Sequence, residues 1–200
     1  MTTTNLIFKE TELRNQLASF PCWKIVAFAA CCAERLMPAY ARYSEKAELD
    51  IESSKLYVNA LELIWGQLSG LEGTRQDFEG MEQRCLKEIP SEDNSWEYGE
   101  LYATDAGAAV TFAIRTWLSC DPQEAVYAAQ RVYDAVDNAV NSESFSYLEE
   151  EQILCHPLIQ RELSRQKYDL EQLETSVAQQ TVINELRFKA QEDALTVFQV

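Results

Sequence analysis

The stretch WKIVAFAACCAERLMPAY, residues Trp23–Tyr40, carries the strongest signal for the fold. From Ile25 to Ala33 every side chain is apolar or a small thiol, so a helix here has no face suited to water. Such a helix must be surrounded by others, which places it at the centre of a helical bundle. Pro21 favours a helix start, and Pro38 predicts a kink within a helix that spans about 22–47.

Apolar residues also recur at helical spacing in most of the other segments. Further helices are predicted over 11–20, 53–68, 75–88, 102–118, 121–140 and 147–155, and a helical arm over 157–200 that is either one long helix or two docked ones. The segment 102–118 is a second largely apolar helix. The turn-rich residues 91–99 (SEDNSWEYG) predict a loop, and residues 1–10 a flexible tail. We therefore expect one all-α domain over residues 1–200, a multi-helix bundle with two central apolar helices and a C-terminal arm packed on it.

The net charge of the chain limits the classes of binding partner that we expect. It has 17 basic and 33 acidic residues, for a formal net charge of −16. Nucleic-acid binding rests on Lys and Arg that displace counterions from phosphates, and anionic membranes would repel this chain in the same way. Neither nucleic acid nor a membrane is therefore an expected partner. The acidity serves solubility, or it attracts a basic protein partner.

The six cysteines bear on the expected compartment. They are Cys22, Cys31, Cys32, Cys85, Cys120 and Cys155. None forms a C-x-x-C pair, and no signal peptide is recognisable at the start of the sequence. The sequence thus predicts reduced thiols and a cytoplasmic protein.

The sequence lacks the residues that several catalytic and metal-binding sites require. The single histidine, His156, precedes Pro157 and is expected to lie at the surface or to cap a helix. Paired Glu-x-x-His motifs, histidine-rich zinc sites and phosphate-binding glycine loops are absent from the sequence. The acidic runs 149–151 and 169–174 offer carboxylates of the kind that magnesium binds, but such runs usually form a solvated helix face. We expect no metal and no cofactor.

Charged residues in apolar surroundings mark the candidate site. Glu34 and Arg35 directly follow the apolar run, and an unpaired buried charge costs several kcal/mol, so each needs a partner or water. Asp105, at the start of the second apolar helix, is the expected partner of Arg35, and Glu62 is a further isolated acid. Nearby hydroxyl groups are expected from Tyr40, Tyr98 and Tyr102. These residues form either a polar pocket between helices or a structural network that locks helix register, with Asp105 as a helix cap.

The four tryptophans divide into two groups. Trp23, Trp65 and Trp117 lie on apolar helices and are expected in the core. Trp96 lies in the polar segment 91–99, where it either packs back over the bundle or marks a contact surface.

The motifs around the first apolar helix resemble the YjaG-like family of bacterial proteins of unknown function. The resemblance rests on Trp23–Tyr40, on LELIW at 61–65, on IPSED at 89–93, and on YGxLYAxDA at 98–106. It implies an all-helical, cytoplasmic, bacterial protein and no activity. The positions that match the family pattern are Glu34, Arg35, Pro38, Tyr40, Trp65, Asp93 and Asp105.

Two functions of different kinds fit these observations. The leading hypothesis is a non-enzymatic interaction module that binds another protein or a second copy of itself, because a catalytic signature is absent from an acidic chain with a Gln- and Glu-rich arm. The alternative is a small-molecule binder or hydrolase that uses Glu34, Arg35, Glu62 and Asp105, with or without magnesium.

Overall fold

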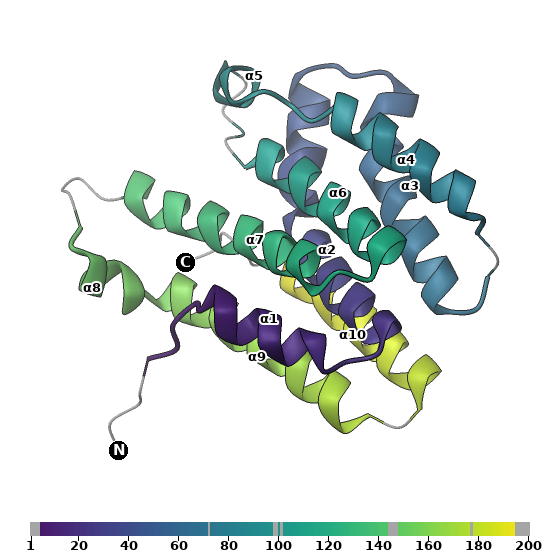
Figure 1. Cartoon of the computed structure of the whole chain (residues 1–200). Coiled ribbons are helices and arrows are strands. Elements are labelled where there is room, and N and C mark those ends of the chain that lie inside the picture. The colour runs from purple at the N-terminus through teal and green to yellow at the C-terminus, as the bar shows by residue number, and fades with distance from the viewer. Residues whose placement is uncertain are drawn as a thin grey trace.

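The computed structural model describes residues 5–71, 73–97, 100, 102–143, 148–176 and 178–194 (Figure 1). Its regular secondary structure, within those ranges, is helical throughout. The helices are α1 (Glu10–Ala18), α2 (Cys22–Lys46), α3 (Ile51–Leu68), α4 (Arg75–Lys87), α5 (Glu92–Glu97), α6 (Ala103–Ser119), α7 (Pro122–Glu143), α8 (Glu150–Leu154), α9 (Pro157–Thr175) and α10 (Gln179–Ala194). The predicted all-α class is confirmed.

Helix α2 occupies the centre of the bundle, as its apolar run predicts. It packs against α3, α6, α7, α9 and α10, and its residues from Ile25 to Ala33 are buried. The second apolar helix, α6, lies against α2 and α7 (Figure 1). Helix α2 continues through Pro38 and ends at Lys46. Many facing side chains on α2 and α6 are alanines, which lets the two helices approach closely.

The segment 91–99 differs from the predicted loop, because residues Glu92–Glu97 form the short helix α5. The Ser91 Oγ accepts a hydrogen bond from the Asn94 backbone amide at 3.1 Å, and the Ser95 amide donates to the Ser91 carbonyl at 2.9 Å. A serine followed by acidic residues is a helix-start signal as well as a turn signal. In this segment Ser91 caps helix α5.

Two of the cysteines form a disulfide, which corrects the expectation that all six are reduced thiols. Cys22, at the start of α2, is bonded to Cys120, directly after α6, and their Cα atoms are 5.3 Å apart. Cys120 has a φ of 54°, the left-handed conformation that glycine usually adopts at a helix end. The bridge ties the two central helices together at one end.

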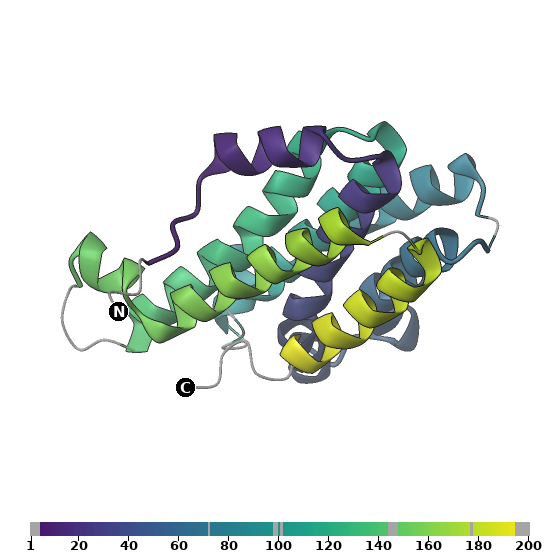
Figure 2. The ribbon, with the colours of Figure 1, turned by 90° about the horizontal axis from the view of Figure 1, so that it is seen from below.

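The C-terminal part folds as two docked helices, the second of the predicted alternatives. Figure 2 shows α9 and α10 side by side and running in opposite directions. Helix α9 contacts α2 and α7, and α10 contacts α2 and α3, so both helices contribute to the core. The first described residues also lie against α9, since Leu6 exchanges two hydrogen bonds of 2.8 Å with the Gln160 side chain.

Across the described ranges, no helix is both long and apolar enough to cross a membrane.

Candidate functional site

A buried ion cluster joins the central helix to α9. The Arg35 side chain is fully buried on α2, where its Nη1 donates to Asp169 Oδ2 at 2.7 Å and its Nη2 donates to Glu162 Oε1 at 3.0 Å. Gln166 lies between the two acids on α9 and donates to the same Glu162 oxygen at 3.0 Å. Both carboxylates are also buried, so one guanidinium balances two acids away from water.

The electrostatics of this cluster are set by burial. Burial raises the pKa of Asp169 to about 6, although Arg35 opposes that shift. Burial likewise raises the pKa of the neighbouring thiol of Cys32, whose sulfur accepts a weak hydrogen bond from Arg35 at 3.4 Å. A buried thiol held protonated is a poor nucleophile, so Cys32 serves here as a packing group and acceptor.

The predicted pairing of Arg35 with Asp105 is wrong. Asp105 lies in the first turn of α6 and pairs with Arg131 of α7, at 3.4 Å between the Asp105 Oδ1 and the Arg131 Nη1. It is also not the predicted helix cap, because Tyr102 occupies that position and makes no capping bond through its side chain. The error arose because α6 and α9 both pack on α2, and local sequence does not tell which of them faces Arg35.

Glu34 and Glu62 belong to a different contact, between α2, α3 and α10. Trp65 donates its indole N–H to Glu34 Oε2 at 2.9 Å, and Glu62 is paired with Arg187. The Arg187 guanidinium also lies over the Trp65 ring, 6.0 Å from its centre. The four residues of the alternative pocket, Glu34, Arg35, Glu62 and Asp105, are therefore divided among three separate contacts.

The remaining predicted residues are also dispersed. Tyr40 is buried and donates its hydroxyl to the Ser53 carbonyl at 2.8 Å. Asp93 is exposed on α5, and Tyr98 lies outside the described residues. His156 caps α9, since its Nδ1 accepts from the Leu158 amide at 3.3 Å, in keeping with one of its predicted roles.

A groove between α5, α6 and α7 gathers acidic residues around one arginine. Its volume is about 580 Å³, and its lining includes Glu92, Trp96, Asp105, Arg131, Asp134 and Asp137. Arg131 donates to Asp134 Oδ2 at 2.7 Å as well as pairing with Asp105. Trp96 is 73% exposed at the groove, so of the two predicted outcomes for this residue it does not pack back over the bundle. We call this feature the α5–α7 groove.

Three of the four carboxyl groups of the α5–α7 groove, those of Asp105, Asp134 and Asp137, are partly buried, whereas Glu92 is exposed. Burial raises the pKa of Asp105 to about 6, which Arg131 only partly offsets, and burial also raises the pKa values of Asp134 and Asp137. In the described part of the chain, neither Asp137 nor Glu92 has an ion-pair partner. The groove thus offers four carboxylates against one guanidinium, and it favours a positively charged ligand.

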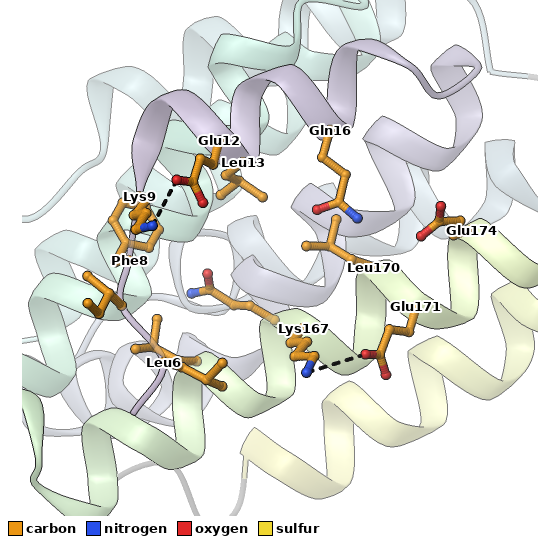
Figure 3. Close-up of a pocket in the computed structure, with 13 residues that line it drawn as sticks. Leu6, Phe8, Lys9, Glu12, Leu13, Gln16, Lys167, Leu170, Glu171 and Glu174 are labelled. Carbon is orange, nitrogen blue, oxygen red and sulfur yellow. Dashed lines mark hydrogen bonds and ion pairs between the residues drawn. The ribbon is translucent and has the colours of Figure 1, made fainter. Parts of the chain in front are cut away.

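A second cavity, the α1–α9 pocket, lies between residues 6–8, α1 and α9 (Figure 3). Its volume is about 390 Å³, and its lining combines seven polar or charged residues with six apolar ones, Leu6, Ile7, Phe8, Leu13, Leu163 and Leu170. Two ion pairs lie at its edge, Lys9 with Glu12 at 2.8 Å and Lys167 with Glu171 at 3.7 Å. Neither this pocket nor the α5–α7 groove contains Glu34, Arg35 or Glu62.

The acidic runs do not form one solvated set. Asp169 is buried against Arg35, while Glu171 is exposed and pairs with Lys167. Among the residues described, no group of three or more His, Cys, Asp and Glu side chains is arranged to hold a metal ion.

Sequence reasoning missed the residues that complete these sites. Glu162, Gln166 and Asp169 lie at helical spacing on one stripe of α9, beside the buried Leu163 and Leu170. That pattern, polar residues repeated on an apolar stripe, is a usable signal for partners of a buried arginine. Asp134 and Asp137 show a similar repeat on α7.

Comparison with known proteins places this arrangement among uncharacterised bacterial relatives. Uncharacterized protein YjaG of Escherichia coli (strain K12) is 25% identical over 154 residues, which cover 76% of this chain and 77% of that protein. Uncharacterized protein YjaG of Salmonella typhimurium (strain LT2) is 24% identical over 154 residues, with the same coverage. These matches confirm the resemblance to the YjaG-like family.

A solved structure shares the fold. The crystal structure of a DUF416 family protein from Shewanella baltica OS155 covers 89% of this chain and 92% of its own, with a TM-score of 0.75 and 21% identity. A family model described as "Protein of unknown function (DUF416)" matches residues 12–196, including the C-terminal helices. Because that match extends over most of the sequence, the chain belongs to the DUF416 family.

Proposed function

We propose that the protein is a non-enzymatic interaction module that binds a basic segment of another protein in the α5–α7 groove. The observation that carries this proposal is the position of Trp96, an exposed tryptophan beside a groove lined by carboxylates. An exposed tryptophan next to acidic groups is suited to Lys or Arg, because its ring face attracts a cation while the carboxylates pair with it.

The charge of the groove supports the same ligand. Arg131 already pairs with Asp105 and Asp134, which leaves Asp137 and Glu92 to meet an incoming cation. The net charge of −16 adds a long-range attraction for basic partners and opposes association of two acidic copies. A heterologous basic partner is therefore favoured over self-association through this face.

The pKa values give the groove a pH response. Since burial raises the pKa of Asp105 to about 6, this residue is partly protonated in mildly acidic solution. A bound cation stabilises the carboxylate, so its binding should strengthen as the pH rises from about 5 to about 7.

The test uses a short lysine–alanine peptide, with a glutamate–alanine peptide as the charge control. Binding is measured by calorimetry and by the change in tryptophan fluorescence, and Trp96→Ala identifies the part that comes from Trp96 among the four tryptophans. The double variant Glu92→Gln/Asp137→Asn removes the two groove charges that do not pair with Arg131, and Glu45→Gln/Glu185→Gln removes two exposed charges elsewhere. We expect the groove variant to weaken lysine-peptide binding at least about tenfold, or about 1.4 kcal/mol, and the matched variant less than about twofold.

Two results would contradict the proposal. Equal weakening by both double variants would mean that only the net charge of the protein attracts the peptide. Binding that is unchanged in Trp96→Ala would remove the aromatic contact on which the proposal rests.

A further inference from the structure

Helix α5 carries the aromatic group on which the proposed function rests, although it is only six residues long. Trp96 and Glu92 both belong to α5 and line the α5–α7 groove. A helix this short makes few hydrogen bonds of its own, because the first four amides of any helix have no partner within it. Figure 1 shows α5 at the edge of the bundle, where it packs on α6. Contacts with residues outside the helix must therefore hold α5 in place.

The hydroxyl group of Thr104, in the first turn of α6, supplies two of these contacts. Thr104 Oγ1 donates to the Pro90 carbonyl at 2.8 Å, just before α5 begins. The same oxygen lies 2.9 Å from Ser95 Oγ, within α5. Because Thr104 has a single hydroxyl proton and shares it with Pro90, Ser95 is the donor of the second bond. One side chain of α6 thus holds the chain on both sides of Glu92.

These bonds fix the residue that directly precedes Trp96. Ser95 is 1% exposed, and its backbone carbonyl also accepts from the Glu100 amide at 2.8 Å, so its side chain and its backbone are both held. Successive side chains of a helix point in different directions, so a buried Ser95 leaves Trp96 facing the groove and the solvent. A mostly exposed indole has few packing contacts, and its position therefore depends on how firmly Ser95 is held.

We propose that Thr104 is a positioning residue for the α5–α7 groove, whose hydroxyl bonds to Pro90 and Ser95 hold Trp96 where it can contact a basic segment. This role rests on the function proposed above for the groove, and it assigns the residue that prepares the aromatic contact. An aromatic group that is fixed before binding loses less conformational entropy when the ligand arrives, so a firmly held Trp96 raises the affinity.

The first test measures the motion of Trp96 in the free protein by NMR relaxation of its indole N–H, which Trp96→Ala assigns. Thr104→Val removes the hydroxyl group and should increase the mobility of the Trp96 indole, whereas Thr104→Ser keeps the hydroxyl and should restore it. Thr111→Val is the matched control, because the Thr111 hydroxyl donates within α6, to the Gly107 carbonyl at 2.8 Å. Unchanged mobility in Thr104→Val, or an equal increase in Thr111→Val, would overturn the proposal.

The second test measures binding of the lysine–alanine peptide by calorimetry. Thr104→Val should weaken binding at least about fivefold, while Thr104→Ser and Thr111→Val should stay within about twofold of the unmodified protein. Because Thr104 acts through Trp96, adding Thr104→Val to Trp96→Ala should weaken binding further by less than about twofold. An equal loss with and without Trp96 would overturn the positioning role.

The two tests separate this role from the proposed function. If the unmodified protein does not bind the peptide, the proposed function fails, whereas the mobility of Trp96 still decides whether Thr104 holds it. Ser95→Ala removes the donor of the same hydrogen bond and should increase the mobility of Trp96 as Thr104→Val does, so it provides the measurement if Thr104→Val fails to fold. Unchanged mobility in Ser95→Ala would also overturn the proposal.

Discussion

Arg35 and Asp169 are hydrogen-bonded at 2.7 Å in the centre of the molecule, although 134 positions separate them in the sequence. Arg35 belongs to the central helix α2 and Asp169 to the C-terminal helix α9. Their contact, with Glu162 beside it, makes α9 part of the core. Removing the C-terminal helices would leave a charged arginine without partners in the apolar centre of the bundle.

Removing one charge of the Arg35 cluster should destabilise the protein strongly, whereas replacing all three charges with apolar side chains should cost little stability. Arg35→Met leaves Glu162 and Asp169 buried without a cation, and we expect a loss of about 3–5 kcal/mol in the free energy of unfolding. The triple variant Arg35→Met/Glu162→Leu/Asp169→Leu removes all three charges and should recover most of that loss. Urea denaturation measures both, and a triple variant as unstable as the single one would contradict the prediction.

The disulfide should contribute strongly to stability because it closes a long loop. Its cysteines are 98 positions apart, and the chain-entropy model gives about 4–5 kcal/mol for a loop of this length. Cys22→Ala/Cys120→Ala should lose most of this amount in urea denaturation. Cys22→Ala/Cys120→Gly should lose about 1 kcal/mol less, because glycine adopts the positive φ of position 120 without strain.

A third cysteine provides the control for the disulfide variants. Cys155 is exposed and is not in the bridge, so Cys155→Ala should change the free energy of unfolding by less than about 0.5 kcal/mol. Equal effects of Cys155→Ala and the bridge variants would show that the disulfide does not account for the loss.

Stability should fall as the pH rises through the mildly acidic range. Burial raises the pKa of Asp105 to about 6 from an ordinary value of 3.8, so the folded protein holds this proton more tightly than the unfolded chain. The resulting stabilisation is fully present below the ordinary pKa and is lost as the pH rises through about 6. Asp105→Asn cannot titrate and should make the fall between about pH 4 and about pH 7 shallower.

Urea denaturation across this range tests the Asp105 prediction. Part of the fall should persist in Asp105→Asn, because burial also raises the pKa of Asp169 to about 6. An identical pH profile for the variant and the unmodified protein would show that Asp105 titrates normally.

Position 107 should tolerate no side chain, because α6 approaches Tyr57 closely there. A Cβ atom at Gly107 would lie 2.8 Å from the Tyr57 hydroxyl oxygen, and that buried hydroxyl donates to the Cys85 carbonyl. We expect Gly107→Ala to lose about 1–3 kcal/mol in the free energy of unfolding. Gly80→Ala in α4 meets open space and should gain about 0.5–1 kcal/mol from helix propensity. Similar effects at both positions would contradict the steric argument.

Much of the fold was predictable because its signals are local. The apolar run Ile25–Ala33 predicts a buried helix wherever it lies, and helix α2 ends within a residue of its predicted boundary. Segment 91–99 was misassigned because serine and acidic residues mark turns and helix starts alike, and only the hydrogen bonds of Ser91 distinguish the two. The disulfide was missed because Cys22 and Cys120 become neighbours only when α2 and α6 pack.

The sequence by itself determined the all-helical class, the central position of α2 and the need of Arg35 for a buried partner, since each follows from residues within a few turns of one another. Only the tertiary structure decided that Glu162 and Asp169 meet that need, that Asp105 instead pairs with Arg131, and that Trp96 lies exposed beside the acidic groove. The physical reason is that helix spacing specifies which face is buried, whereas the identity of a partner depends on how the helices pack against one another.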